Sequence, residues 1–446
     1  MKLTPCRLIV IIGLALGGIL PRVSAQEYFN RIDTPEDLAP VPSSSDMLAP
    51  QAVENPSENV DISNPGAPSE PGGEERYNMA LGNLHFGLAA GIGLEYNSNV
   101  NLAPSGQEIS DWAIRPSVTI DSTYALSDLN TLHFSIGASY AKYFSHSEFD
   151  TRGVLISPNS ILALTMHVGP VAITLRDRFS YQEDPFAEPT ISNTADYRRL
   201  ENQVGIQADW AVNDKFTLTG GYDHYNLWTF DSEFDSLERS VDTVFIKPSY
   251  QIIPAARVGI DVSASFVRFN EDIQNNGDNY MIGPFIDVAL ATNTHLYAEA
   301  GYQDFRFDNN GTILDNSDAN TWYARVDLAN RLTESFDHRI TFTKSAEVGD
   351  GSNYYELYHL EYAADWRITQ NITLDPSLFY EHYTTSAPLG DTGEKADRYG
   401  ASIGVRYIVS ASLTLGLDYR YVYKDSNLPD LDYRQNLVLL SLYYNF

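Results

Sequence analysis

The sequence predicts an all-β fold, a transmembrane, antiparallel, up-and-down β-barrel of about 18 strands that follows a disordered N-terminal tail. Beyond Leu84, apolar residues occupy every second position in segment after segment, and a period of two is typical of strands. Short and long connections alternate between these segments, which is the wiring of outer-membrane barrels. The face opposite the apolar one is strongly charged, which favours an aqueous interior over a dry core.

The first element is a secretory signal peptide, predicted over residues 1–25. Lys2 and Arg7 precede an apolar run at residues 8–20, and a small-x-small cleavage pattern ends at Ala25. The run is too short to span a bilayer as a helix, and no later stretch is long and apolar enough. An exported chain of this kind that enters a membrane must cross it as strands.

Residues 26–80 form the second predicted element, a disordered Pro/Ser/Glu-rich periplasmic tail. The segment has too little apolar surface to compensate for the entropy that ordering would cost. It is interpreted as a spacer, with a periplasmic docking segment as the alternative.

The third predicted element is an outer-membrane β-barrel over residues 81–446. Eight short turns and nine longer connections join eighteen alternating segments. Short turns are expected in the periplasm and long loops outside the cell, so both termini are expected in the periplasm. The short turns are predicted at 127–129, 169–170, 213–214, 253–255, 292–293, 333–334, 369–371 and 410–411. The longer connections are predicted at 99–110, 145–152, 183–196, 230–238, 270–278, 308–319, 349–353, 386–397 and 425–434.

The apolar face of each strand is predicted to contact lipid. All five tryptophans fall at segment ends, where amphipathic rings favour the membrane interfaces. Two features conflict with this assignment. Asp177 falls on the outward face, where transfer of a carboxylate into lipid has an unfavourable free energy. Five prolines also fall within predicted strands on that face, where bulges would have to absorb the lost hydrogen bonds; they are Pro116, Pro158, Pro248, Pro284 and Pro376.

The last strand resembles the signature that outer-membrane barrels present to their assembly machinery. Leu440, Leu442, Tyr444 and Phe446 alternate up to a terminal aromatic residue. This resemblance implies the barrel assembly machinery as a partner, and outer-membrane lipid and lipopolysaccharide are the other expected partners.

The inward face supplies the candidate pore-lining residues. Aromatic rings beside hydrogen-bonding groups would suit a saccharide path, whereas arginines opposite carboxylates would create the transverse field of a general porin. A third interpretation is that the rings only fill space. The candidates are Arg176, Arg178, Arg199, Tyr297, Tyr323, Arg325, Asp327, Arg331, Arg339, Tyr355, Arg367, Tyr383, Arg398, Arg406, Asp418 and Arg420.

No catalytic, cofactor or metal residues are predicted. The net charge of −30 argues against nucleic acid as a partner. The single cysteine, Cys6, lies in the predicted signal peptide, which excludes disulfides and thiol chemistry from the mature chain. The acidic loops lack the spacing of a calcium loop. His359 beside Glu361 is the best candidate for a catalytic pair, and a structural hydrogen bond in the lumen is the preferred interpretation.

Residues 90–100, Ala90-Gly-Ile-Gly-Leu-Glu-Tyr-Asn-Ser-Asn-Val100, complete the sequence argument. They resemble the opening strand of the putative beta-barrel porin family found near exopolysaccharide genes in Gram-negative bacteria, with Asn97 in place of that family's aspartate. The resemblance implies an outer-membrane pore linked to polysaccharide export and no catalytic residues.

The sequence thus predicts a non-enzymatic channel for small hydrophilic solutes or saccharides. The alternative is a barrel closed by its loops, with a structural or surface-interaction role. Single-channel conductance separates the two.

Overall fold

The structure is a computed structural model that describes residues 79–127, 129–186, 188–388 and 391–446. The predicted signal peptide and all but the last two residues of the predicted tail lie outside these ranges. Within them, no helix is long and apolar enough to cross a membrane. The described chain is almost entirely β-structure, as the alternation of apolar residues predicts.

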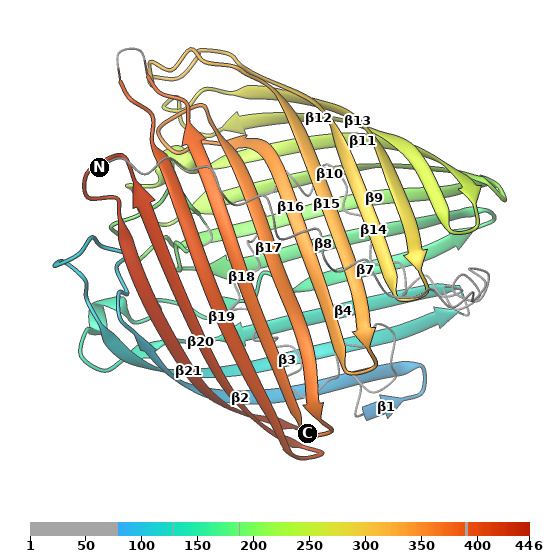
Figure 1. Cartoon of the computed structure of the whole chain (residues 1–446), viewed down its shortest axis with the longest axis horizontal. Helices are drawn as coiled ribbons and strands as arrows, with labels where there is room; N and C mark the ends of the chain where they lie inside the picture. The colour runs from blue at the N-terminus through green and yellow to red at the C-terminus, as the bar shows by residue number, and fades with distance from the viewer. Residues whose placement is uncertain (1–78, 128, 187, 389–390) are drawn as a thin grey trace.

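Eighteen long strands close into an antiparallel barrel, which confirms the predicted fold class (Figure 1). Each strand pairs with the next, and the last strand returns to the first, with Leu442 opposite Ile92. In chain order the strands are β2 (Leu84–Asn97), β3 (Asp111–Ser127), β4 (Asn130–Ser139), β7 (Ile161–Val168), β8 (Val171–Gln182), β9 (Arg199–Asn213), β10 (Phe216–Thr229), β11 (Arg239–Ile253), β12 (Ala256–Phe269), β13 (Gly277–Ala291), β14 (Thr294–Phe307), β15 (Ala319–Thr333), β16 (Phe336–Val348), β17 (Tyr354–Thr369), β18 (Ile372–Thr385), β19 (Lys395–Ser410), β20 (Leu413–Ser426) and β21 (Tyr433–Asn445).

Shorter elements interrupt this plan in three places. At its start, β1 (Met79–Leu81) forms a hairpin with β2. The connection from β4 to β7 contains β5 (Lys142–Tyr143), the 3-10 helix η3 (Ser147–Phe149) and β6 (Leu155–Ile156), and a second 3-10 helix, η4 (Asp235–Leu237), precedes β11. Pro158 therefore lies between β6 and β7, so its prediction as a strand residue was wrong.

The connections alternate in length as predicted. Each of the eight short turns joins its two strands where the sequence placed it, for example between Val168 and Val171. We call this end of the barrel the short-turn end and the opposite end the long-loop end. β2 starts and β21 finishes at the short-turn end, so the described chain begins and ends on the same side (Figure 1).

The apolar face points away from the barrel interior. Leu378, Ile282 and Leu440 are 57%, 52% and 51% exposed, so these side chains do not meet in a dry centre. The five tryptophans are 37% to 49% exposed and lie near strand ends. A soluble protein does not present such a large continuous apolar surface to water, so this outer surface is suited to contact with lipid.

Three strand prolines interrupt the backbone pairing with one neighbouring strand, and the register is the same on either side of the gap. The β11–β12 ladder passes from Ile246↔Val262 to Ser249↔Gly259 across Pro248 and keeps its register. The β13–β14 and β17–β18 ladders skip Pro284 and Pro376 in the same way. The expectation of bulges at these prolines was wrong, because each proline keeps a continuous ladder on its other side.

Asp177 keeps its predicted outward orientation and has a partner. The amide Nδ2 of Asn202 on the neighbouring strand donates a hydrogen bond of 2.6 Å to its Oδ1. The pair offsets part of the cost of a carboxylate near lipid, because a charge-assisted hydrogen bond replaces one to water.

Replacing the terminal aromatic ring is expected to impair assembly but not the closed barrel. The backbone N–H of Phe446 donates to the carbonyl of Leu88 at 3.0 Å, a bond that Phe446→Ala retains. A lower yield of heat-modifiable barrel from this variant would therefore report recognition of the ring. Phe144→Ala removes a 63% exposed ring from a loop and serves as the control. Equal yields from both variants would contradict the predicted assembly signal.

Candidate functional site

One long connection crosses the barrel interior. It joins β8 to β9, and we call its described residues, 183–186 and 188–198, the crossing loop. The carbonyl of Pro189 accepts hydrogen bonds from Tyr383 Oη at 2.9 Å and Lys424 Nζ at 3.1 Å. Lys424 Nζ also donates to Ser192 Oγ at 2.9 Å. In the ring of eighteen strands, Tyr383 on β18 lies eight or nine positions from β8 and β9, and Lys424 on β20 lies six or seven positions from them, so the loop spans the lumen.

Phe186 anchors the tip of the crossing loop in the opposite wall. Its side chain is 1% exposed and packs in an apolar cluster with Leu102, Phe379, Val422 and Tyr433. The guanidinium carbon of Arg420 lies 3.9 Å from the centre of the phenyl ring, and that of Arg398 lies 5.0 Å away. A desolvated cation–π contact contributes about 2 kcal/mol, so these two arginines hold the loop tip.

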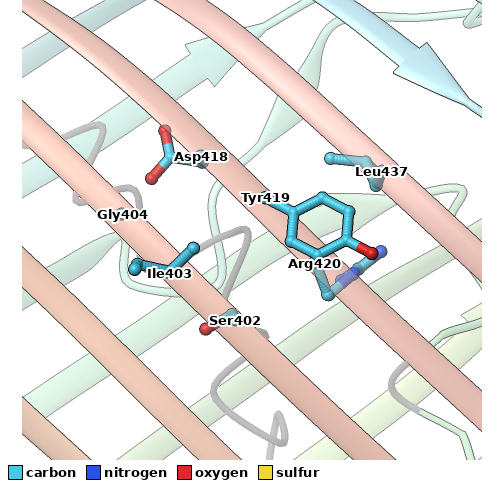
Figure 2. A pocket seen from close by; sticks show the side chains of 7 residues that line it. All are labelled: Ser402, Ile403, Gly404, Asp418, Tyr419, Arg420 and Leu437. Atoms are coloured by element: carbon cyan, nitrogen blue, oxygen red, sulfur yellow. The ribbon is translucent and has the colours of Figure 1, made fainter.

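A small pocket lies in the wall beside this anchor (Figure 2). Gly404 forms part of it, and a Cβ there would approach Asp418 Oδ1 to 2.8 Å, so the glycine leaves room for that carboxylate. The lining residues are Ser402, Ile403, Gly404, Asp418, Tyr419, Arg420 and Leu437. Arg420 is thus shared between the anchor and the pocket.

Arg398, which contacts the Phe186 ring, is itself held by a series of buried polar contacts in the wall. Arg398 Nη1 lies 2.7 Å from Glu381 Oε2, and both side chains are fully buried. Glu381 Oε1 lies 3.1 Å from His359 Nδ1. His359 Nε2 is 3.8 Å from Glu361, the partner proposed from sequence. Burial of the first pair keeps these groups away from a passing solute, which fits the structural interpretation of His359.

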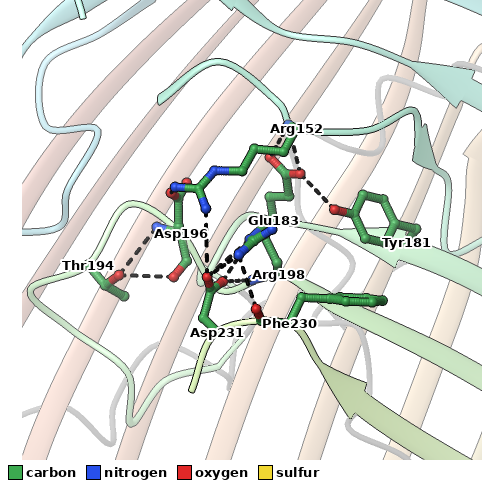
Figure 3. Close-up of polar contacts among 8 residues, drawn as sticks. All are labelled: Arg152, Tyr181, Glu183, Thr194, Asp196, Arg198, Phe230 and Asp231. Atoms are coloured by element: carbon green, nitrogen blue, oxygen red, sulfur yellow. Dashed lines mark hydrogen bonds and ion pairs between the residues drawn. The ribbon is translucent and has the colours of Figure 1, made fainter. Parts of the chain in front are cut away.

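The base of the crossing loop is held by a second polar network (Figure 3). Arg198 Nε donates to Asp231 Oδ2 at 2.9 Å. Glu183 accepts hydrogen bonds from Tyr181 Oη at 2.9 Å and from the backbone N–H of Arg152 at 3.1 Å. The loop is therefore fixed at both ends, as expected of a segment that keeps one position in the lumen.

The carboxylates of the base network differ in acidity. The hydrogen bond from Arg198 lowers the pKa of Asp231 below its ordinary value. Burial instead raises the pKa of Glu183 and of Asp196. Only the Asp231 carboxylate is therefore favoured in its charged form by its surroundings.

Acid is expected to release the loop base only at low pH. The Arg198–Asp231 pair contributes stability above the ordinary aspartate pKa and loses it as pH falls through the lowered folded-state pKa. Glu183 and Asp196 favour the folded state when protonated, so they take up protons earlier without opening the network. Single-channel conductance should stay constant as the pH falls from 7 to the ordinary aspartate pKa and should change only below it.

Asp231→Asn provides the matched control for this pH dependence. The variant should show the altered conductance already at pH 7 and little further change on acidification. A change in the parent protein with a midpoint at pH 5 or higher would contradict the assignment to Asp231.

The structure separates the sixteen candidate pore-lining residues into two groups. Half are at most 8% exposed, and half are more accessible. The buried half comprises Arg199, Tyr297, Tyr323, Tyr355, Tyr383, Arg398, Asp418 and Arg420. The accessible half comprises Arg176, Arg178, Arg325, Asp327, Arg331, Arg339, Arg367 and Arg406. The four tyrosines are too buried to offer a ring face to a sugar, and Tyr383 instead holds the crossing loop. A pore-lining role for the accessible half stays a prediction.

Four of the seven accessible arginines pair with carboxylates along the wall, namely Arg176, Arg325, Arg331 and Arg406. Arg325 Nε lies 2.7 Å from Asp327 Oδ2, and Arg406 Nη1 lies 2.6 Å from Asp375 Oδ2 on the adjacent strand. Such pairs neutralise each other locally, whereas a transverse field needs the two signs on opposite walls. Within the described ranges, no group of three or more His, Cys, Asp or Glu side chains is arranged to hold a metal ion.

Sequence reasoning missed the crossing loop itself. Phe186 is a large aromatic residue directly after Asp184-Pro185 in a mostly polar connection, and that contrast is a local signal of an inward anchor. Glu381 and Lys424 were also missed, because their importance comes from contact with the loop.

Among the comparisons with known proteins, a family model covers the whole barrel. The family model described as Putative beta-barrel porin 2 matches residues 81–446. No curated protein matches the chain.

Several solved structures are similar to the chain at low identity. Pseudomonas aeruginosa OpdK with vanillate has 9% identity and a TM-score of 0.46, covering 81% of this chain and 99% of that one. Pseudomonas aeruginosa OccK2 (OpdF) in complex with glucuronate has 11% identity and a TM-score of 0.47, covering 82% and 99%. Acinetobacter baumannii OccAB3 has 11% identity and a TM-score of 0.45, covering 82% and 100%.

Proposed function

Since the chain belongs to the Putative beta-barrel porin 2 family, we propose that it is a porin-like channel of the outer membrane for small hydrophilic solutes, saccharides included. The crossing loop, fixed to the opposite wall at Pro189 and Phe186, carries this proposal. A loop held across a wide barrel narrows the passage and limits the size of solute that can pass.

The proposal includes an orientation. Short turns face the periplasm and long loops face outside in bacterial outer-membrane barrels, which places the crossing loop toward the outer mouth. Lipid and lipopolysaccharide would contact the outward apolar face, and the barrel assembly machinery would bind β21. Exopolysaccharide export rests only on the resemblance of residues 90–100.

A loop-closed barrel with a structural role is the second candidate. The observation that favours it is an apolar cluster inside the barrel at the long-loop end, in which Leu227, Val267 and Phe305 are at most 1% exposed. Apolar packing of this kind excludes water from part of the cross-section.

Conductance of the purified full chain in planar bilayers distinguishes the two. A channel gives ohmic steps that scale with the conductivity of the salt solution, and a closed barrel gives none. Liposome swelling with sugars of increasing size then sets the size limit. Correctly folded protein that is silent in both assays would overturn the channel.

A further inference from the structure

The barrel wall has a break between β15 and β16. Their ladder ends at Ala324↔Lys344, although β15 starts at Ala319 and β16 continues to Val348. The flanking ladders continue beyond this level, because β14 pairs with β15 up to Phe305↔Ala319 and β16 pairs with β17 up to Val348↔Tyr354. The first residues of β15 and the last residues of β16 therefore separate toward the long-loop end.

The end of β16 lies on the lumen side of its neighbours. The amide of Gln303, on β14, is 1% exposed and makes two hydrogen bonds with the backbone of Ala346, to its N–H at 2.9 Å and to its carbonyl at 2.8 Å. This contact reaches past β15 to β16. The two sides of the break thus overlap, with β14 and β15 outside and the end of β16 inside.

Apolar side chains fill this overlap. By alternation Ala346 shares the outward face of β16 with Ile340, which is 37% exposed, yet Ala346 itself is fully buried. It packs in the interior apolar cluster with Phe305, Phe307 and Ala319. The outward face of β16 therefore passes from lipid contact to contact with the interior cluster.

A buried lysine marks the entrance to the overlap. Lys344 is fully buried at the point where the ladder ends, although it lies on the outward face. Its ammonium lies 3.1 Å from Glu356 Oε2 and donates to Thr321 Oγ1. The same ammonium is 5.3 Å from the centre of the Trp322 ring and 5.8 Å from that of Tyr358. Trp322 is 49% exposed on the lipid-facing side, so its indole ring lies between the ammonium and the membrane.

We infer that this overlap is a lateral binding site for an amphiphile with one anionic headgroup and an apolar tail. Lys344 binds the headgroup, and the tail packs against the interior apolar cluster, whose side chains are at most 8% exposed and must move apart to admit it. A buried ammonium needs an anionic partner, and a carboxylate from the membrane can replace that of Glu356, which keeps a 32% exposed side chain and can turn to water. The strands can separate there because no backbone ladder joins them. This route differs from the axial path of the proposed channel.

Photocrosslinking of the full chain in nanodiscs tests the site. The probe is a palmitic acid analogue with a diazirine near its methyl end, and the matched control probe is the corresponding alcohol. Adducts of the acid should concentrate on β14 to β16, and Lys344→Gln should reduce them about tenfold, as loss of one charge-assisted contact predicts. Lys344→Arg should retain them, and Lys395→Gln, which removes an exposed lysine elsewhere, should have no effect.

The outcomes separate this inference from the channel. Adducts spread evenly around the lipid-facing surface, or unchanged in Lys344→Gln, would overturn the lateral site. Heat-modifiability verifies that each variant is folded. Conductance of the same preparations tests the channel independently, because the axial path does not pass between β15 and β16.

Discussion

Replacing residues 185–195 of the crossing loop with a short Gly-Ser linker is expected to raise single-channel conductance several-fold. The segment spans the lumen, so its removal widens the passage at that level, and ionic current rises with open area. The substitution retains Glu183 and Arg198, so the base network persists. Planar-bilayer recordings in identical salt give the measurement.

A control variant distinguishes a wider pore from general damage. Arg306→Gln removes a charge that is 68% exposed on the outward face, far from the lumen. This variant should conduct like the parent protein. Unchanged conductance in the loop replacement would show that the loop does not limit the current.

Arg398→Met is expected to lower the free energy of unfolding by about 3 to 5 kcal/mol, because removal of one partner leaves a buried charge uncompensated. The charge is that of Glu381, which is fully buried and would retain only His359 as a partner among those described. The variant also removes a hydrogen bond to the Phe186 carbonyl, so the loop tip should detach and the open-channel current should become noisy. Urea unfolding followed by tryptophan fluorescence measures the first effect.

The double variant Arg398→Met/Glu381→Gln is the matched control for the charge. It removes both members of the pair, so most of the lost stability should return while the loop tip stays detached. If the single and double variants unfold at the same urea concentration, burial of an unpaired carboxylate is not the cause of the destabilisation.

The short-range features of the barrel could be predicted with accuracy. Each turn required only a local interruption of the alternation, as at Gly169-Pro170. Ile282 and Leu378 could be assigned to the outward face because the residues two positions away along each strand continue the same apolar alternation. The exceptions were also local in origin. Pro158 was placed in a strand because the pattern does not distinguish a regular strand from the short pieces β5 and β6.

The candidate site could be predicted only in part. The sequence placed Tyr383, Arg398 and Arg420 on the inward face, which their contacts with the crossing loop require. It interpreted them as pore lining, whereas the structure uses them to hold the loop. Burial decides between these roles, and the alternation of residues carries no information about what covers an inward side chain.

The sequence by itself determined the strands, their two faces and the order of short and long connections. These features depend on the alternation of apolar and polar residues, which involves only residues close together along the chain. Only the tertiary structure decided where the crossing loop ends and where β15 and β16 separate. The contact of Tyr383 with Pro189 joins residues 194 positions apart, and Gln303 reaches Ala346 past an intervening strand. Such contacts depend on the closed geometry of the whole barrel, which brings distant residues together.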